Sequence, residues 1–196
     1  NRYVFRCRNT DKICVFTDKG QMHTIKVMDL PYGRFRDKGT PIDNFGNYSS
    51  AAEQMIYVDA LENIKNHKLL FVSRAGMVKQ VDGAEFDVVK RTIAATKLSD
   101  ETDSLVFAGV CDENEYVVLQ SGDGYFLKFL VQEVPEKKKA AIGVRGIRLG
   151  AGDFVEHAYL LANGMDYRIV YKEKEISLAD RIKLAKRDGK GTKIRV

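Results

Sequence analysis

One pattern occurs four times in this sequence, and it constrains the fold more than any other feature. A short apolar run leads into a polar turn that contains glycine, at residues 13–20, 69–76, 116–124 and 159–164. Apolar strands joined by a glycine turn are typical of β-hairpins. Because a repeat at a regular period decides the architecture before local propensity does, the chain is predicted to consist of four similar β-units.

The apolar runs are continuous, which indicates strands covered on both faces, as in stacked sheets. Segments 55–58, 104–108 and 154–158 predict one further strand per unit. About four strands in 40 to 56 residues is the size of a propeller blade. We therefore expect one all-β domain, a β-propeller of about four four-stranded blades at roughly 1–50, 51–100, 101–150 and 151–196, in a ring that need not be complete. Without tryptophan the WD40 signature is excluded, and the paired glycines of kelch blades are missing.

A second landmark follows each turn glycine, at residues 38–42, 94–98, 143–147 and 190–194. The distance from glycine to landmark is 19, 18 and 19 residues in the first three copies and 27 in the fourth. The fourth unit is therefore predicted to be degenerate or to carry an insertion, with a short helix over 178–186.

Composition fits a globular protein that attracts anions. The 196 residues carry a formal net charge of +5 with a pI of about 9.0. Cys7, Cys14 and Cys111 have no metal-ligand or disulfide spacing, which favours a reducing cytoplasm, and Cys14 is expected in the core. No run is apolar enough to span a membrane, and the ends suggest a fragment of a longer chain.

No catalytic or metal-binding constellation is apparent. His23, His67 and His157 are scattered, and surface positions are expected for them. The segments 122–124 and 188–191 lack the spacing of phosphate-binding loops, and no acid/base pair stands out. We expect no catalytic residue, metal or cofactor in this fragment.

The landmarks carry a family resemblance. Residues 143–149 (Gly-Val-Arg-Gly-Ile-Arg-Leu) and 36–42 (Arg-Asp-Lys-Gly-Thr-Pro-Ile) resemble blade signatures of the C-terminal domain of DNA gyrase A subunits, and the turns at 17–20 and 73–79 are similar to hairpin turns of that family. The glutamine-arginine-arginine-glycine-glycine box of gyrase is absent, which favours the related topoisomerase IV A subunit or a gyrase-like relative, but an earlier blade could carry the box, so the assignment within the family stays open.

This resemblance implies a β-pinwheel, in which neighbouring blades exchange strands and duplex DNA bends around a basic outer rim. It also implies a role in an ATP-dependent type IIA topoisomerase, with the rest of the A subunit forming a homodimer, and with ATP and Mg²⁺ used elsewhere, largely by the B subunit.

Cations near the turns and landmarks are the candidate phosphate contacts, because such contacts dominate sequence-independent DNA binding. The candidate set is Lys26, Arg34, Arg36, Lys38, Lys79, Arg91, Lys97, Lys128, Lys137, Lys138, Lys139, Arg145 and Arg148. The fourth unit adds Lys186, Arg187, Lys190 and Lys193. The alternatives are a protein-interaction propeller that docks an acidic partner, and an unrelated propeller enzyme with a site in its central channel.

Overall fold

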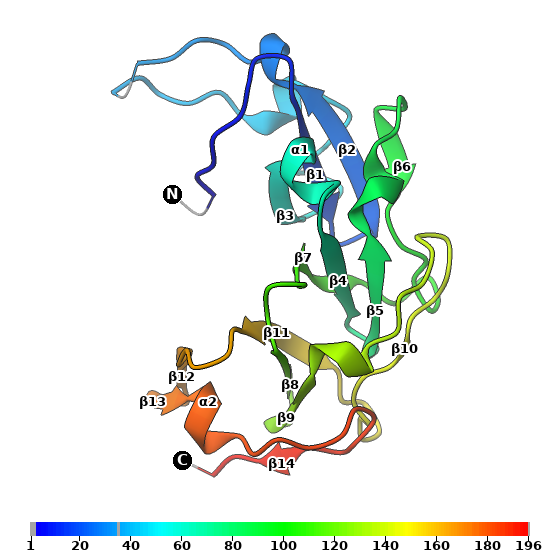
Figure 1. Cartoon of the computed structure of the whole chain (residues 1–196), viewed down its shortest axis with the longest axis vertical. Helices are drawn as coiled ribbons and strands as arrows, with labels where there is room; N and C mark the ends of the chain where they lie inside the picture. Colours follow the sequence, from blue (N-terminus) through cyan, green and yellow to red (C-terminus); the bar gives the residue numbers. More distant parts are fainter. Residues whose placement is uncertain (1–2, 35, 196) are drawn as a thin grey trace.

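The β-sheets follow one another along an open arc, shown in Figure 1. The computed structural model describes residues 3–34 and 36–195. Within these residues there are three four-stranded sheets, which we call blades 1 to 3, and one two-stranded sheet, which we call the fourth hairpin. The predicted all-β, propeller-like class is confirmed, while the expectation of a fourth four-stranded blade is wrong for the described part of the chain.

Each blade has the same strand order. Blade 1 consists of β3 (Met55–Ala60), β1 (Lys12–Thr17), β2 (Gln21–Lys26) and β6 (Thr92–Ala94). Blade 2 consists of β7 (Leu105–Val110), β4 (Lys68–Ser73), β5 (Met77–Asp82) and β10 (Val144–Arg145). Blade 3 consists of β11 (Val155–Leu161), β8 (Tyr116–Ser121), β9 (Tyr125–Leu130) and β14 (Thr192–Lys193). The fourth hairpin is β12 (Arg168–Tyr171) and β13 (Lys174–Ser177).

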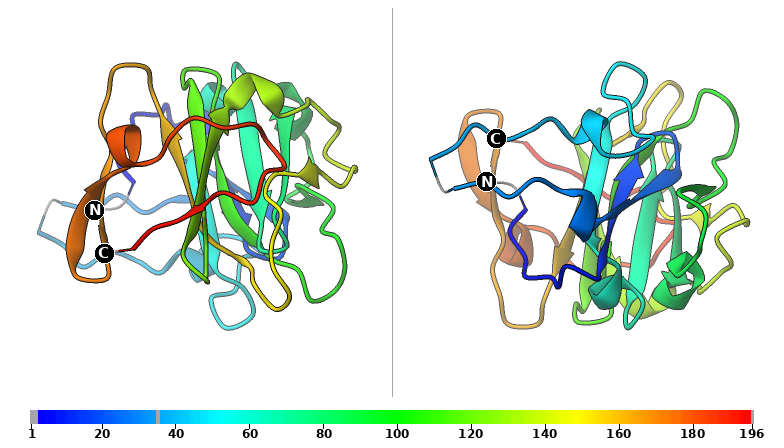
Figure 2. Two further views of the ribbon diagram at one scale, coloured as in Figure 1. Left: turned by 90° about the horizontal axis from the view of Figure 1, so that it is seen from below. Right: turned by 90° about the horizontal axis from the view of Figure 1, so that it is seen from above.

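The blades exchange strands. Every blade takes its central hairpin from one sequence repeat and both flanking strands from the next repeat, so blade 1 combines β1 and β2 with β3 and β6. The four sequence units at 1–50, 51–100, 101–150 and 151–196 are thus not the sheets themselves. The strand exchange fastens each unit to its neighbour, and the two end-on views in Figure 2 show the sheets stacked face to face.

The first three predicted hairpins are confirmed. Gly20, Gly76 and Gly124 have φ of 71°, 83° and 82°, a left-handed conformation that favours glycine. The fourth predicted hairpin, at 159–164, is wrong: β11 ends at Leu161 and pairs with β8. The fourth hairpin turns instead at Lys172 and Glu173, which adopt φ of 48° and 65° without glycine.

This turn restores the period of the repeat. Counted from Glu173, the landmark glycine Gly191 lies 18 residues downstream, as in the other copies. The fourth unit therefore needs no insertion between turn and landmark. Its glycine signal at Gly164 belongs to a connecting loop, where φ is also positive at 72°.

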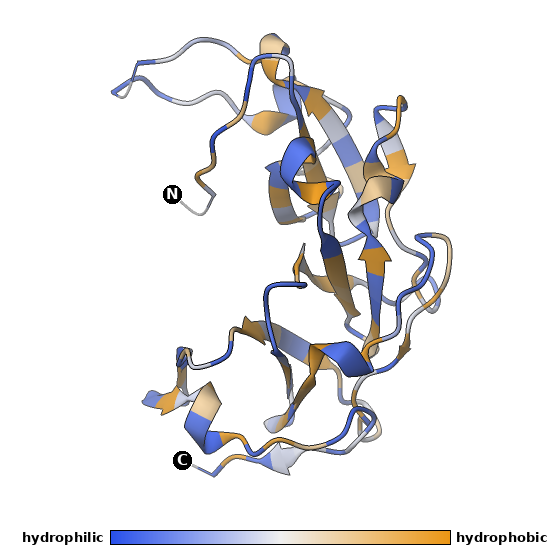
Figure 3. Cartoon of the chain, viewed as in Figure 1, coloured by the Kyte–Doolittle hydropathy of each residue, from blue (hydrophilic) through white to orange (hydrophobic). Residues whose placement is uncertain are grey.

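Three apolar layers hold the blades together. Leu69 and Phe71 of β4 face blade 1, whereas Leu70 and Val72 face blade 3, and all four are at most 2% exposed. This confirms the prediction of strands covered on both faces. A third layer, including Val118, joins blade 3 to the fourth hairpin. Figure 3 shows how hydrophobic residues concentrate in the strands.

Short helical turns connect the blades. The helix α1 (Leu61–Ile64) buries Leu61 and Ile64 against blade 1. The predicted helix over 178–186 forms only as α2 (Leu178–Arg181), where the Ser177 side chain accepts a hydrogen bond from the Asp180 amide. No helix in the described ranges is long and apolar enough to cross a membrane.

Candidate nucleic-acid interface

The short outer strands β6, β10 and β14 lie on the convex side of the arc (Figure 1). Each is an edge strand of its blade and contains part of a predicted landmark. These three outer strands are only two or three residues long, so their flanking loops contribute most of the convex surface. The loops beside the three outer strands therefore follow one another along the convex side of the arc (Figure 1).

Cations accompany all three outer strands. The exposed ones beside β6 are Lys90, Arg91 and Lys97; those beside β10 are Lys138, Arg145 and Arg148, with Lys137 and Lys139 half-buried; those beside β14 are Lys186, Lys190, Lys193 and Arg195, with Arg187 half-buried. The cluster around β14 contains the four cations that the fourth unit was expected to add, Lys186, Arg187, Lys190 and Lys193. Arg195 was missed altogether.

Some of these cations already have protein partners. Arg145 forms a two-pronged ion pair with Asp188, and the hydrogen bonds from Arg145 are the main reason that the pKa of Asp188 is lowered. Lys138 Nζ lies 3.2 Å from Glu85 Oε1, although its side chain is 84% exposed. By contrast, no carboxylate of the described residues lies within ion-pair distance of Arg91, Lys97 or Arg148.

Lys79 and Lys128 do not belong to this surface. Lys79 is 1% exposed and donates to the carbonyl oxygens of Lys138, Lys139 and Ala141, while burial lowers the pKa of Lys79 to about 8. Lys128 is 8% exposed and donates to the carbonyl of Ala179, and burial lowers its pKa as well. Neither ammonium group is available to a phosphate in this conformation, so both leave the candidate set.

The four N-terminal candidates are exposed but lie elsewhere. Lys26 ends β2, and Arg34, Arg36 and Lys38 occupy a long loop that extends from the end of the arc (Figure 1). The landmark at 38–42 forms no strand, unlike its three equivalents. The structure therefore places the predicted clusters around β6, β10 and β14 on the convex side, and the cluster at Arg34, Arg36 and Lys38 away from it (Figure 1).

The histidines do not form a metal site. His23 was expected at the surface, but it is 2% exposed and lies between Glu53 and the Thr92 hydroxyl, with its ring nitrogens 2.5 and 3.0 Å from these oxygens. His67 Nδ1 lies 3.1 Å from Asp112 Oδ1. Among the described residues no three His, Cys, Asp or Glu side chains gather in a way that could hold a metal ion. Cys14 is buried in the core as predicted, and burial raises the pKa of its thiol to about 12.

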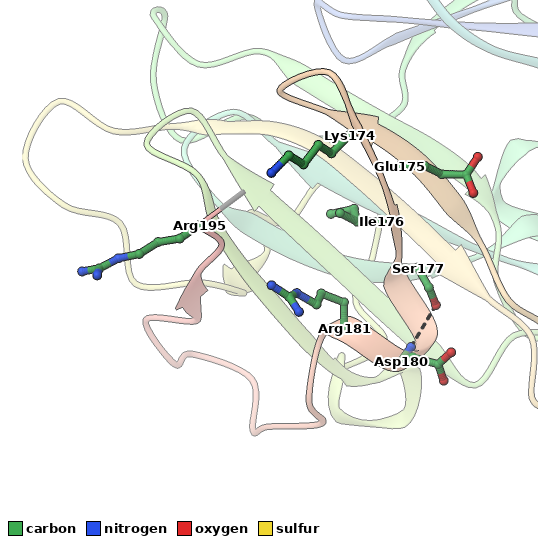
Figure 4. A pocket seen from close by; sticks show the side chains of 7 residues that line it. All are labelled: Lys174, Glu175, Ile176, Ser177, Asp180, Arg181 and Arg195. Atoms are coloured by element: carbon green, nitrogen blue, oxygen red, sulfur yellow. Dashed lines mark hydrogen bonds between the residues drawn. The ribbon is translucent and has the colours of Figure 1, made fainter.

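A cavity of about 540 Å³ lies beside the fourth hairpin and is drawn in Figure 4. Lys174 and Arg181 extend toward the same side of it, while Arg195, on the C-terminal segment, directs its guanidinium group away from both (Figure 4). Glu175 and Asp180 also line it. This mixed-charge lining contains no histidine or cysteine, and its one hydroxyl group, that of Ser177, donates a hydrogen bond to Asp166 Oδ1 at 2.5 Å.

Known proteins match both the sequence and this architecture. A family model described as "DNA gyrase C-terminal domain, beta-propeller" matches residues 67–112 and 115–162. The DNA gyrase A subunit of Lawsonia intracellularis is 30% identical over 158 residues, 81% of this chain and 19% of that protein. The crystal structure of the C-terminal domain of DNA topoisomerase IV superimposes with a TM-score of 0.85 at 26% identity, covering 95% of this chain and 59% of that one. The chain belongs to this family of C-terminal domains of topoisomerase A subunits.

Both branches of the family are represented among the matches. The DNA topoisomerase 4 A subunit of Streptococcus pneumoniae is 25% identical over 175 residues, 87% of this chain and 21% of that protein. The Escherichia coli ParC C-terminal domain shares the fold with a TM-score of 0.77, at 18% identity over 97% of this chain and 79% of that one. The domain spans about a fifth of the length of the curated relatives it matches.

Proposed function

We propose that this domain binds duplex DNA without sequence specificity and bends it around the convex side of the arc. The observation that supports this most directly is the recurrence of exposed cations beside β6, β10 and β14. Each phosphate that a cation neutralises releases condensed counterions, so a repeated series of cations can follow the backbone of a curved duplex. Contacts of this kind fix position without reading bases, and bendable DNA is the expected preference.

The family extends this proposal to the whole protein. We infer that the domain guides strand passage in a gyrase or topoisomerase IV A subunit, which pairs as a homodimer and works with the ATPase B subunit in the bacterial cytoplasm. The catalytic steps, with ATP and Mg²⁺, are assigned to other parts of that assembly. Supercoiling and decatenation are both compatible with the domain.

Fluorescence anisotropy with a linear duplex over a salt series tests the binding. If about six to ten phosphates are engaged, affinity falls by about a thousandfold to a hundred-thousandfold between 50 and 200 mM salt. A flat salt response, or no binding at 50 mM salt, contradicts the proposal and favours a protein-docking propeller.

A pair of matched variants tests the location. Replacing Arg91, Lys97 and Arg148 together by alanine removes three cations of the convex side that have no carboxylate partner. Each lost contact at 0.1 M salt weakens binding about eightfold, so the combined loss is at least about a hundredfold.

The control removes the same charge from another surface by replacing Arg6, Arg8 and Lys65 with alanine. Arg6 and Arg8 lie in the N-terminal segment, and Lys65 follows α1 on the concave side (Figure 1). Only a small loss of affinity is expected for this control. Equal losses for both triple variants indicate a response to net charge alone and contradict a convex interface.

A further inference from the structure

Lys79 uses its whole hydrogen-bonding capacity on one loop. Its Nζ donates to the carbonyl oxygens of Lys138, Lys139 and Ala141 at 3.0, 2.9 and 2.6 Å. An ammonium group has three donors and no acceptor, so every proton of Lys79 is matched to one carbonyl. Hydrogen bonds from a charged donor are stronger than neutral ones. These three bonds hold the backbone of the loop at one buried ammonium group.

The rest of the loop at 135–141 is tied to the same strand. The Gln80 amide donates to the carbonyl of Pro135, and the Lys137 amide donates to the carbonyl of Gln80. Glu85 holds the other side, where its carboxylate accepts from the Lys139 amide at 3.1 Å. The loop backbone thus faces inward onto β5, and the Lys138 side chain is left 84% exposed.

The repeat itself does not require a cation at this position. In the strand registers, Lys79 lies opposite Phe71 as His23 lies opposite Val15 and Leu127 lies opposite Leu119. The equivalent residue of blade 3 is therefore a leucine, which costs nothing to desolvate. Burial of an ammonium is unfavourable unless it is fully hydrogen-bonded, so Lys79 is explained by the loop that it holds and not by the blade.

We infer that Lys79 is a positioning residue of the DNA interface: it fixes the loop at 137–141 so that Lys137 and Lys138 reach the backbone of the bound duplex. Lys79 itself touches no DNA. This inference rests on the proposed function, because it assigns to one buried side chain the geometry of one part of that surface.

A double-mutant cycle separates this role from a general effect on folding. Lys79→Met keeps the length of the side chain and removes its donors. It is expected to weaken duplex binding about eightfold at 0.1 M salt and to lower the salt slope by about 0.9, the effect of one lost phosphate contact. In a background that carries Lys137→Ala, Lys138→Ala and Lys139→Ala, the same substitution changes affinity less than about twofold, because the contacts that it would misplace are already gone. Equal weakening in both backgrounds, or none in the otherwise unaltered protein, overturns the inference.

Lys128→Met is the matched control. Lys128 is also a buried lysine with a lowered pKa, but its ammonium holds the carbonyl of Ala179 in α2. Its substitution is expected to have the same effect on affinity in both backgrounds. A selective effect of Lys128→Met in the background with lysines at 137–139 argues against a specific role of Lys79.

Two further measurements do not depend on comparing DNA affinities between variants. Without DNA, the amides of Lys137, Lys139 and Ala141 should exchange hydrogen faster in Lys79→Met than in the unaltered protein, and unchanged exchange overturns the inference even if DNA binding itself fails. Should Lys79→Met not fold, NMR of the lysine ammonium groups of the unaltered protein still tests it. The ammonium protons of Lys79 should exchange slowly with water, and their chemical shift should not change when duplex is added. A shift that shows the Lys79 ammonium contacting a phosphate would refute a positioning role.

Discussion

The carboxylate of Asp103 fastens an exchanged strand, and its removal gives a stability prediction that can be worked out from the structure. Asp103 is 8% exposed and directly precedes the segment that enters β7. Its Oδ1 accepts hydrogen bonds from the amides of Ala75 and Ser104, both at 2.9 Å, and its Oδ2 accepts from the Ser99 amide at 3.3 Å. Because Ala75 lies in the turn between β4 and β5, one side chain connects the hairpin of one repeat to the strand of the next.

Asp103→Ala removes all three bonds. A hydrogen bond to a charged group contributes about 1.5–3 kcal/mol, but the amides of the exposed residues Ala75 and Ser99 can regain water. The free energy of unfolding should therefore fall by the contribution of the bond to Ser104 and by part of the contributions of the other two bonds, together about 2–3 kcal/mol. For a chain of this length that corresponds to a fall in Tm of about 5–10 °C.

Urea denaturation followed by circular dichroism measures this loss, with an unchanged m-value showing that the same surface is exposed on unfolding. Asp100→Ala is the matched control, because the exposed Asp100 carboxylate accepts only from Thr102 and from the Asp103 amide within its own loop. A loss below about 1 kcal/mol for Asp103→Ala, or an equal loss for Asp100→Ala, refutes the reasoning.

Three further changes have expected outcomes. Glu173→Gly relieves a φ of 65° in the turn of the fourth hairpin and should raise the free energy of unfolding by about 1 kcal/mol, seen as a higher Tm. Gly83→Ala places a Cβ 1.7 Å from the Ile64 carbonyl oxygen, so it should destabilise the domain by about 3 kcal/mol or more in urea titrations. Lys79 has a pKa of about 8 in the fold, below its value in the unfolded chain, so the unfolded state binds more protons above pH 8. The free energy of unfolding should therefore rise with pH from about 8 to about 10.4, and Lys79→Met should lose that rise.

The repeat could be predicted from sequence because local chemistry specifies it. Gly20, Gly76 and Gly124 mark the three hairpin turns, since their positive φ is disfavoured for other residues. Unbroken apolar runs such as 69–72 predicted strands covered on both faces, because polar residues would otherwise alternate with them. The fourth turn was misplaced for the same reason: Lys172 and Glu173 adopt positive φ without glycine, and Gly164 offered the only local signal.

The sequence predicted which residue types form the candidate site, but only part of where they lie on the surface. The recurrence of cations at the landmarks was visible in the sequence, but Lys79 and Lys128 looked identical to surface lysines. Whether an ammonium meets water or a carbonyl depends on a loop about 60 residues away, such as the one that reaches Lys79 from Ala141. The pairing of Arg145 with Asp188 also joins distant parts of the chain, 43 residues apart.

The amino-acid sequence thus determined the β-hairpins, their period and the sign of the charge, because each follows from neighbours along the chain. Tertiary structure decided which repeat supplies which strand, where the fourth turn lies and which cations face solvent. These properties depend on packing between residues far apart in sequence. A buried lysine and an exposed one differ only in what the rest of the fold brings to them.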